Sequence, residues 1–98
     1  MKWTVGFSAR VRKQRDKLPP AIFDAFAALV REIQEGGPVR SGWPHYGKLK
    51  GRSQCHHCHL NKGKPRYVAV WQVVDGKICF VEVRYVGTHE GADYGRVC

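Results

Sequence analysis

Residues 55–59 read Cys-His-His-Cys-His, so two thiols and three imidazoles fall within five consecutive positions. Three kinds of chemistry use such a cluster. The string Cys-x-x-Cys-His attaches a c-type haem, thiolates and imidazoles together bind zinc, and imidazoles can move protons at a phosphodiester. The face of the secondary-structure element on which each side chain lies helps to decide among the three.

We expect residues 55–60 to form a strand, in which successive side chains point to opposite faces. Cys55 and Cys58 then diverge, whereas a zinc site needs two converging thiolates. Haem is attached after export, and the sequence shows no export signal. We therefore predict no metal and no cofactor, and we keep a zinc-binding module as an alternative. The other possible ligands are scattered: Cys79, His89 and Cys98.

The first half of the chain predicts a strand and two helices. Residues 3–8 are apolar and aromatic, which is typical of a strand, and Ser8 can cap a helix that begins near Ala9. Pro19 and Pro20 end this helix and open the next. The second helix has apolar residues at helical spacing, and a Gly-Gly pair followed by proline ends it. The apolar stripe consists of Ile22, Phe26, Leu29, Val30 and Ile33.

The second half predicts a loop and a sheet. Residues 38–54 are rich in glycine and proline and form a long loop, which Trp43 and Leu49 anchor to the core. Three strands follow at 55–60, 66–74 and 78–86, and Asp75-Gly76 predicts a two-residue hairpin turn between the last two. The fold class is therefore α+β in a single domain, 1–98. An N-terminal strand and an α-helical hairpin precede an antiparallel three-strand meander, with the helices packed on one face of the sheet.

Alternation along the strands assigns the polar side chains to the face that the helices leave open. In the last strand, Cys79, Val81, Val83 and Tyr85 are expected to face the helices. The opposite set is Ile78, Phe80, Glu82 and Arg84. In the middle strand the open set is Arg66, Val68, Val70 and Gln72, and in the first it is Cys55, His57 and His59. This places imidazoles beside guanidinium groups on one surface.

The charge of the chain predicts a polyanionic partner. It has 17 Lys and Arg against 8 Asp and Glu, a formal charge of +9, which suits nucleic acid, an acidic protein or an anionic membrane surface. The sequence contains no signal peptide and no transmembrane run, so we expect a cytoplasmic protein whose cysteines are free thiols or metal ligands. Basic side chains expected on RNA phosphates are Lys48, Lys50, Arg52, Lys62 and Lys64.

Two segments, KLKGRSQCHHCHL (48–60) and RYVAVWQVVDGKICFVEVRYVGTHEGADY (66–94), resemble the RelE/ParE toxin superfamily. The GTHEGADY end is similar to the YafQ branch. The resemblance implies a RelE-like fold and an mRNA interferase, a ribosome-dependent endoribonuclease that is the toxin of a type II toxin–antitoxin system. It also implies an acidic antitoxin as partner, with the ribosome and mRNA. DNA would be contacted only through the antitoxin complex, and no membrane is involved.

The resemblance also implies roles for particular residues. His89 stands at the position of the principal acid/base histidine, and Tyr94 at that of the C-terminal aromatic that stacks on a base or assists near the scissile phosphate. His57 and His59 fall where RelE has two lysines. Arg66 precedes the strand tyrosine, whereas the family arginine usually follows it. The further C-terminal helix of the family is expected to be missing or replaced, because the sequence ends four residues after Tyr94.

The implied reaction needs no metal. The ribose 2′-OH attacks the adjacent phosphate and leaves a 2′,3′-cyclic phosphate and a 5′-OH, which requires a base, an acid and positive charge near the phosphate. We hypothesise His89 as base, His59 or His57 as acid, and Arg66 with Arg84 as phosphate clamp. The alternatives are a gyrase inhibitor of the ParE type, a non-catalytic basic RNA-binding module and an inactive toxin.

Overall fold

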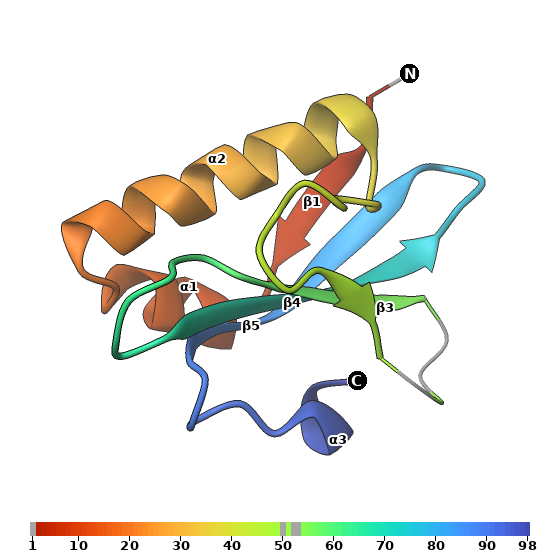
Figure 1. Ribbon diagram of the computed structural model, residues 1–98. Helices are drawn as coiled ribbons and strands as arrows, with labels where there is room; N and C mark the ends of the chain where they lie inside the picture. The colour runs from red at the N-terminus through yellow and green to blue at the C-terminus, as the bar shows by residue number, and fades with distance from the viewer. Residues whose placement is uncertain (1, 50, 52–53) are drawn as a thin grey trace.

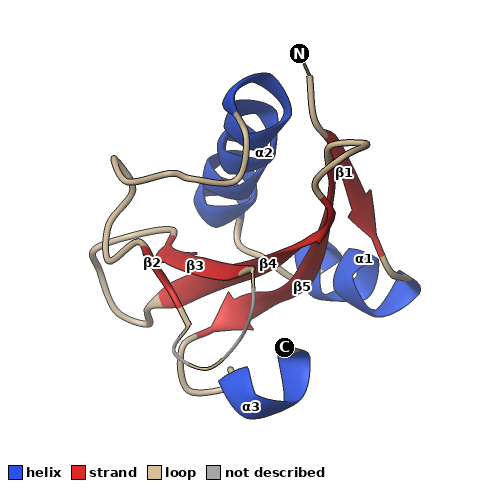
Figure 2. Ribbon diagram, turned by 90° about the vertical axis from the view of Figure 1, so that its right-hand side faces the viewer, coloured by secondary structure: helices blue, strands red, loops and turns tan. Residues whose placement is uncertain are grey.

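The computed structural model describes residues 2–49, 51 and 54–98. One five-stranded sheet, with strand order β1-β5-β4-β3-β2, carries α2 on one face and α3 on the other (Figures 1 and 2). None of the described helices is long and apolar enough to cross a membrane. The elements are β1 (Thr4–Phe7), α1 (Ala9–Asp16), α2 (Pro20–Gly36), β2 (Gly47–Lys48), β3 (Cys55–His59), β4 (Tyr67–Asp75), β5 (Phe80–Thr88) and α3 (Tyr94–Val97).

The predicted α+β class, helical pair and antiparallel meander are confirmed. Strand β1 pairs in parallel with β5, while β5, β4, β3 and β2 pair antiparallel in succession. The predicted loop 38–54 needs a correction because it contains β2, which extends the sheet beyond β3. Two residues are too few to show an alternating pattern, so the sequence could not indicate this strand.

Helix α1 begins and helix α2 ends at the residues that the capping patterns predict. The Ser8 hydroxyl accepts a hydrogen bond from the Val11 amide at 3.2 Å, and Gly37, with φ of 95°, ends α2. A glycine suits this position because a side chain there would be strained. The apolar stripes of both helices cover the sheet and form the main core, in which Leu29, Ile33 and Trp71 are almost fully buried. Burying each such side chain contributes about 1.5–3 kcal/mol.

The turn between β4 and β5 is longer than predicted. Asp75 pairs with Phe80, so the connection contains four residues rather than the two of an Asp-Gly hairpin. The Asp75 carboxylate accepts hydrogen bonds from the amides of Lys77 and Ile78 at 2.9 and 3.3 Å. Cys79 closes the turn with φ of 54°. The side chain of Asp75 therefore stabilises the wider turn.

A β-bulge corrects the predicted faces of β5. Val70 pairs with Tyr85 and Trp71 with Val83, so Arg84 has no partner in the register. The extra residue shifts the alternation, because two residues then oppose one on the neighbouring strand. Tyr85 consequently faces away from α2, in contrast to the prediction, while Val86 joins the main core.

The face opposite α2, predicted to be open, is partly covered. Val68, Val70 and Tyr85 form a second, smaller apolar cluster. Residues of the C-terminal segment and of the loop before β3 pack against it: Leu49, Ala92, Tyr94, Val97 and Cys98. The short helix α3 thus lies over the predicted open face.

The cysteines also differ from expectation. Cys55 and Cys98 form a disulfide that spans 43 positions of the sequence, whereas all four were predicted to be free thiols or metal ligands. Cys58 and Cys79 lie outside this disulfide, and both are buried. Burial raises the pKa of Cys58 to about 12, so this thiol remains protonated and unreactive. The pairing requires the C-terminus to fold back over β3, and the spacing of the cysteines alone does not reveal that.

Candidate active site

Three histidines from separate parts of the chain meet on the face opposite α2. The ring of His59 lies 4.3 Å from that of His45 and 5.5 Å from that of His89, measured between centroids. His59 belongs to β3, His45 to the loop before β2, and His89 follows β5. Imidazoles this close together can pass protons to and from one small group bound beside them.

Strand β3 positions two of the histidines by its alternation. Cys55, His57 and His59 share one face, while His56 and Cys58 lie on the other, as the strand pattern predicted. The His57 ring lies 5.6 Å from that of Tyr94 on α3. Its Nδ1 atom is buried and has no hydrogen-bond partner among the described residues. An unpaired buried nitrogen is a candidate to bind a ligand.

Two hydrogen bonds fix the start of the turn that carries His89. The His89 amide donates to the Arg66 carbonyl at 2.7 Å, and the Tyr85 hydroxyl donates to the Thr88 carbonyl at 2.8 Å. A Cβ on Gly91 would lie 2.8 Å from the Tyr85 hydroxyl. The close approach of this turn to Tyr85 therefore requires glycine, and it places His89 beside His59.

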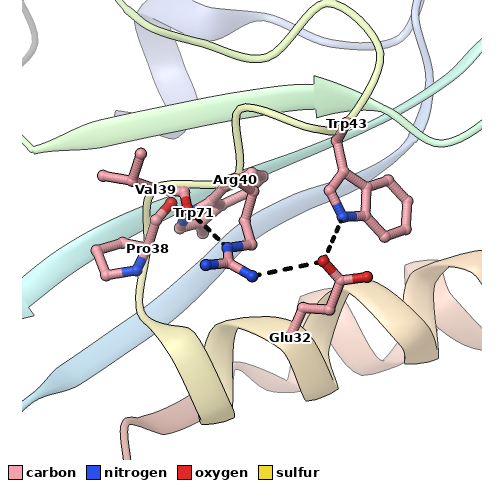
Figure 3. A network of polar contacts seen from close by, with 6 residues as sticks. All are labelled: Glu32, Pro38, Val39, Arg40, Trp43 and Trp71. Atoms are coloured by element: carbon pink, nitrogen blue, oxygen red, sulfur yellow. Dashed lines mark hydrogen bonds and ion pairs between the residues drawn. The ribbon is translucent and has the colours of Figure 1, made fainter.

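His45 is a site residue that sequence reasoning missed. The segment before it is tied to α2, because Glu32 accepts hydrogen bonds from the Trp43 indole at 3.0 Å and from Arg40 at 3.4 Å (Figure 3). At the start of this segment, the Trp71 indole donates a hydrogen bond to the Pro38 carbonyl at 3.0 Å (Figure 3). Trp43 and Leu49 both pack against apolar clusters, as predicted.

The backbone around His45 explains why its ring reaches β3. His45 has φ of 53°, an uncommon conformation for a residue other than glycine. The His59 amide donates to the Pro44 carbonyl at 2.8 Å, which brings the loop alongside the strand. The only signal in the sequence was a histidine within a long loop, and such a signal does not fix where the loop folds.

The surroundings of His57 and His59 lower the pKa values of these two rings. Burial is the main cause for both His57 and His59, and the neighbouring His45 adds to it. His89 and Arg66 lower the pKa of His59 further. Desolvation and nearby positive charge both disfavour the imidazolium form. Both rings are therefore mainly neutral near pH 7, ready to accept a proton.

His56 belongs to the core rather than to this site. It is 1% exposed, and its ring stacks 5.8 Å from Trp71 and 5.9 Å from Tyr46. Its Nδ1 atom shares a hydrogen bond of 2.7 Å with the Tyr46 hydroxyl. Burial lowers its pKa to about 4, with smaller contributions from Lys48 and His57. His56 is thus a neutral aromatic component of the fold.

The predicted arginines are separated. Arg66 is exposed and lies close enough to His59 to lower the pKa of that ring. Arg84 instead forms an ion pair with Glu82 at 3.1 Å. It lines a cavity of about 390 Å³ together with Arg10 and Arg96, and none of the histidines lines that cavity. Of the two predicted arginines, Arg66 lies beside the histidine cluster and Arg84 does not.

The predicted RNA-contacting side chains are exposed where the structure describes them: Lys48, Lys62 and Lys64. Lys50 and Arg52 lie outside the described residues. Within the described part of the chain, no three His, Cys, Asp or Glu side chains form a group that could hold a metal ion.

Comparison with known proteins shows which solved structures have a similar fold. No protein-family model and no curated protein matches the chain. The structure is similar to that of a double arginine-to-alanine mutant of the E. coli toxin RelE in the free state, with 24% identity and a TM-score of 0.72 over 94% of this chain and 88% of that one. It is also similar to the Staphylococcus aureus YoeB dimer, with 15% identity and a TM-score of 0.69 over 91% and 99%.

A third similar structure is the archaeal RelE–RelB complex from Pyrococcus horikoshii OT3, with 18% identity and a TM-score of 0.64 over 94% of this chain and all of that one. The predicted resemblance to the RelE superfamily is thereby confirmed at the level of the fold.

Proposed function

We propose that this chain, which has the RelE fold, is the toxin of a toxin–antitoxin system and acts as a metal-independent endoribonuclease on mRNA at the ribosome. The observation that carries the proposal is the contact of His59 with His89 and His45 on the face opposite α2. A general acid, a general base and positive charge are what cleavage by a neighbouring 2′-OH requires.

His59 is the better general base. Its lowered pKa keeps the ring neutral at physiological pH, so it can take the proton of the 2′-OH. His89, exposed beside it, then gives a proton to the leaving 5′ oxygen. This reverses the roles hypothesised from the sequence, in which His89 is the base and His59 or His57 the acid. The reason is burial, because a desolvated imidazole does not readily hold the proton that an acid must supply.

The phosphate is held by groups near the two histidines. Arg66 lies beside His59 and supplies charge for the developing phosphorane. His45 contacts the His59 ring and adds a hydrogen-bond donor. Tyr94, next to His57, offers a ring on which a nucleobase can stack. Arg84 belongs to a separate cavity, so we assign it no part in the reaction.

The positive charge of the chain can attract both RNA and an acidic inhibitor protein. A formal charge of +9 attracts the phosphates of mRNA and of the ribosome through exposed lysines such as Lys48 and Lys62. An acidic antitoxin would neutralise the same surface. RelE is found with the antitoxin RelB in similar structures, and for this chain we propose a cytoplasmic antitoxin complex, which alone contacts DNA.

Mapping of mRNA 5′ ends on programmed ribosomes tests the proposal. Wild type is expected to cut translated mRNA and to leave a 2′,3′-cyclic phosphate and a 5′-OH. His59→Ala and His89→Ala are each expected to lose about 10²-fold or more, the usual worth of a positioned acid or base. Lys77→Ala, at the exposed β4–β5 turn, is the matched control.

Full cleavage by both histidine variants would reject the assignment of the site. A wild-type protein that leaves mRNA intact and instead blocks DNA supercoiling by gyrase would favour the ParE-like alternative. Far-UV circular dichroism of each variant establishes that the fold is kept.

A further inference from the structure

The disulfide joins the two halves of the proposed site. Cys55 is the first residue of β3 and shares a face with His57 and His59. Cys98 follows α3, whose first residue, Tyr94, contacts the His57 ring at 5.6 Å. The covalent bond therefore fixes the segment that carries the aromatic ring to the strand that carries the histidines.

The C-terminal segment has few other attachments. A helix of four residues is too short to be stable alone, and the Asp93 side chain makes no capping hydrogen bond. The Arg96 and Val97 amides donate only to the Asp93 carbonyl, within the segment itself. Contact with the sheet comes from partly buried side chains over Val68, Val70 and Tyr85.

We propose that the Cys55–Cys98 pair is a redox-controlled attachment. In the disulfide form it holds α3 and Tyr94 against His57 and gives the active enzyme; in the dithiol form the segment detaches and activity falls. The effect on activity rests on the proposed function, whereas the attachment itself does not. Because cytoplasmic thiols are normally reduced, the protein gains activity under oxidising conditions.

The oxidation is a thiol–disulfide exchange with a small disulfide such as oxidised glutathione. The Cys98 thiolate attacks one sulfur of that disulfide, forms a mixed disulfide and releases one thiol. The Cys55 thiolate then attacks the Cys98 sulfur, closes the intramolecular bond and releases the second thiol. The two cysteines lose two electrons and two protons, which the two released thiols carry. Cys98 reacts first because it is partly exposed, whereas Cys55 is fully buried.

The main core does not include this bond. The main core lies on the other face, between α2 and the sheet, and contains neither Cys55 nor Cys98. Cys58 stands on the core side, and burial raises its pKa to about 12, so it does not compete in the exchange. Cys79 lies in the β4–β5 turn, immediately before β5.

The experiment uses the full chain, oxidised with glutathione disulfide or reduced with dithiothreitol. Amide hydrogen exchange at Arg96 and Val97 is read by mass spectrometry, and cleavage of ribosome-bound mRNA is measured in parallel. On reduction we expect exchange at these amides to rise about tenfold or more and cleavage to fall about tenfold to hundredfold. Circular dichroism establishes that both forms are folded.

Two variants complete the test. Cys98→Ser is expected to behave as reduced wild type in both conditions, and Cys79→Ser is expected to respond as wild type does. Unchanged exchange on reduction overturns the proposal, as does unchanged cleavage when exchange rises. If neither form cuts RNA, the proposed function fails, and the exchange measurement still decides whether the disulfide holds α3.

Discussion

Acidification is expected to destabilise the fold through His56. This ring is 1% exposed and stacked between Tyr46 and Trp71, and burial lowers its pKa to about 4 from an ordinary 6.5. The unfolded chain binds a proton at this residue below pH 6.5, whereas the folded chain does so only below about pH 4. The contribution to stability is therefore present above pH 6.5 and is lost as the pH falls towards 4.

The magnitude follows from the difference between the two pKa values. A shift of about 2.5 units at about 1.4 kcal/mol each gives about 3 kcal/mol. That is a large part of the stability of about 5–15 kcal/mol that a small domain has. Urea unfolding between pH 7 and pH 4, followed by tryptophan fluorescence with the disulfide intact, measures the free energy of unfolding.

His56→Phe provides the comparison because it keeps an aromatic ring beside Trp71 but cannot be protonated. The carboxylates and the other histidines contribute equally to the pH dependence of stability in the two proteins. Between pH 7 and pH 4, the free energy of unfolding is expected to fall by about 3 kcal/mol less in the variant than in wild type. Equal losses in the two proteins would refute the argument that a buried, neutral His56 governs acid stability.

Three further outcomes are expected. The acidic limb of kcat/KM for mRNA cleavage should lie below pH 6.5, because burial lowers the pKa of His59; a limb at or above pH 6.5 would contradict its role as base. Replacing Cys98 with serine should lower the free energy of unfolding by about 4 kcal/mol in urea titrations, the chain-entropy value for a loop of 43 residues; a change below about 1 kcal/mol would show that the unfolded chain gains little freedom. Lys48→Ala should weaken binding to RNA of any sequence and reduce the slope of log affinity against log salt by about one. Fluorescence anisotropy with a 2′-O-methyl RNA oligonucleotide, which lacks the attacking hydroxyl, measures this slope, and an unchanged slope would remove Lys48 from the interface.

Local patterns determined the elements and most of the faces. Ser8, the paired prolines and Gly37 mark the helix ends because capping depends on the backbone within a few residues. Alternation along β3 placed His57 and His59 on one side, since the side-chain period of a strand is a local property. The charge of +9 also follows from composition alone.

The pairing of strands decided what local patterns could not. The bulge at Arg84 arises from the register between β4 and β5, so alternation counted along one strand assigned Tyr85 to the wrong face. The bulge also leaves Arg84 at a cavity that none of the histidines lines. A one-residue shift in register reverses every later side chain, and it depends on contacts with the neighbouring strand.

The sequence by itself determined which side chains were available: a histidine-rich strand, a histidine after the last strand, and a basic surface. Only the tertiary structure brought His45 from its loop to His59 and closed the bond between Cys55 and Cys98. Both contacts join positions far apart in the chain, and the free energy that forms them comes from packing of the whole fold. Residue type sets the possible chemistry, and long-range folding decides which groups meet.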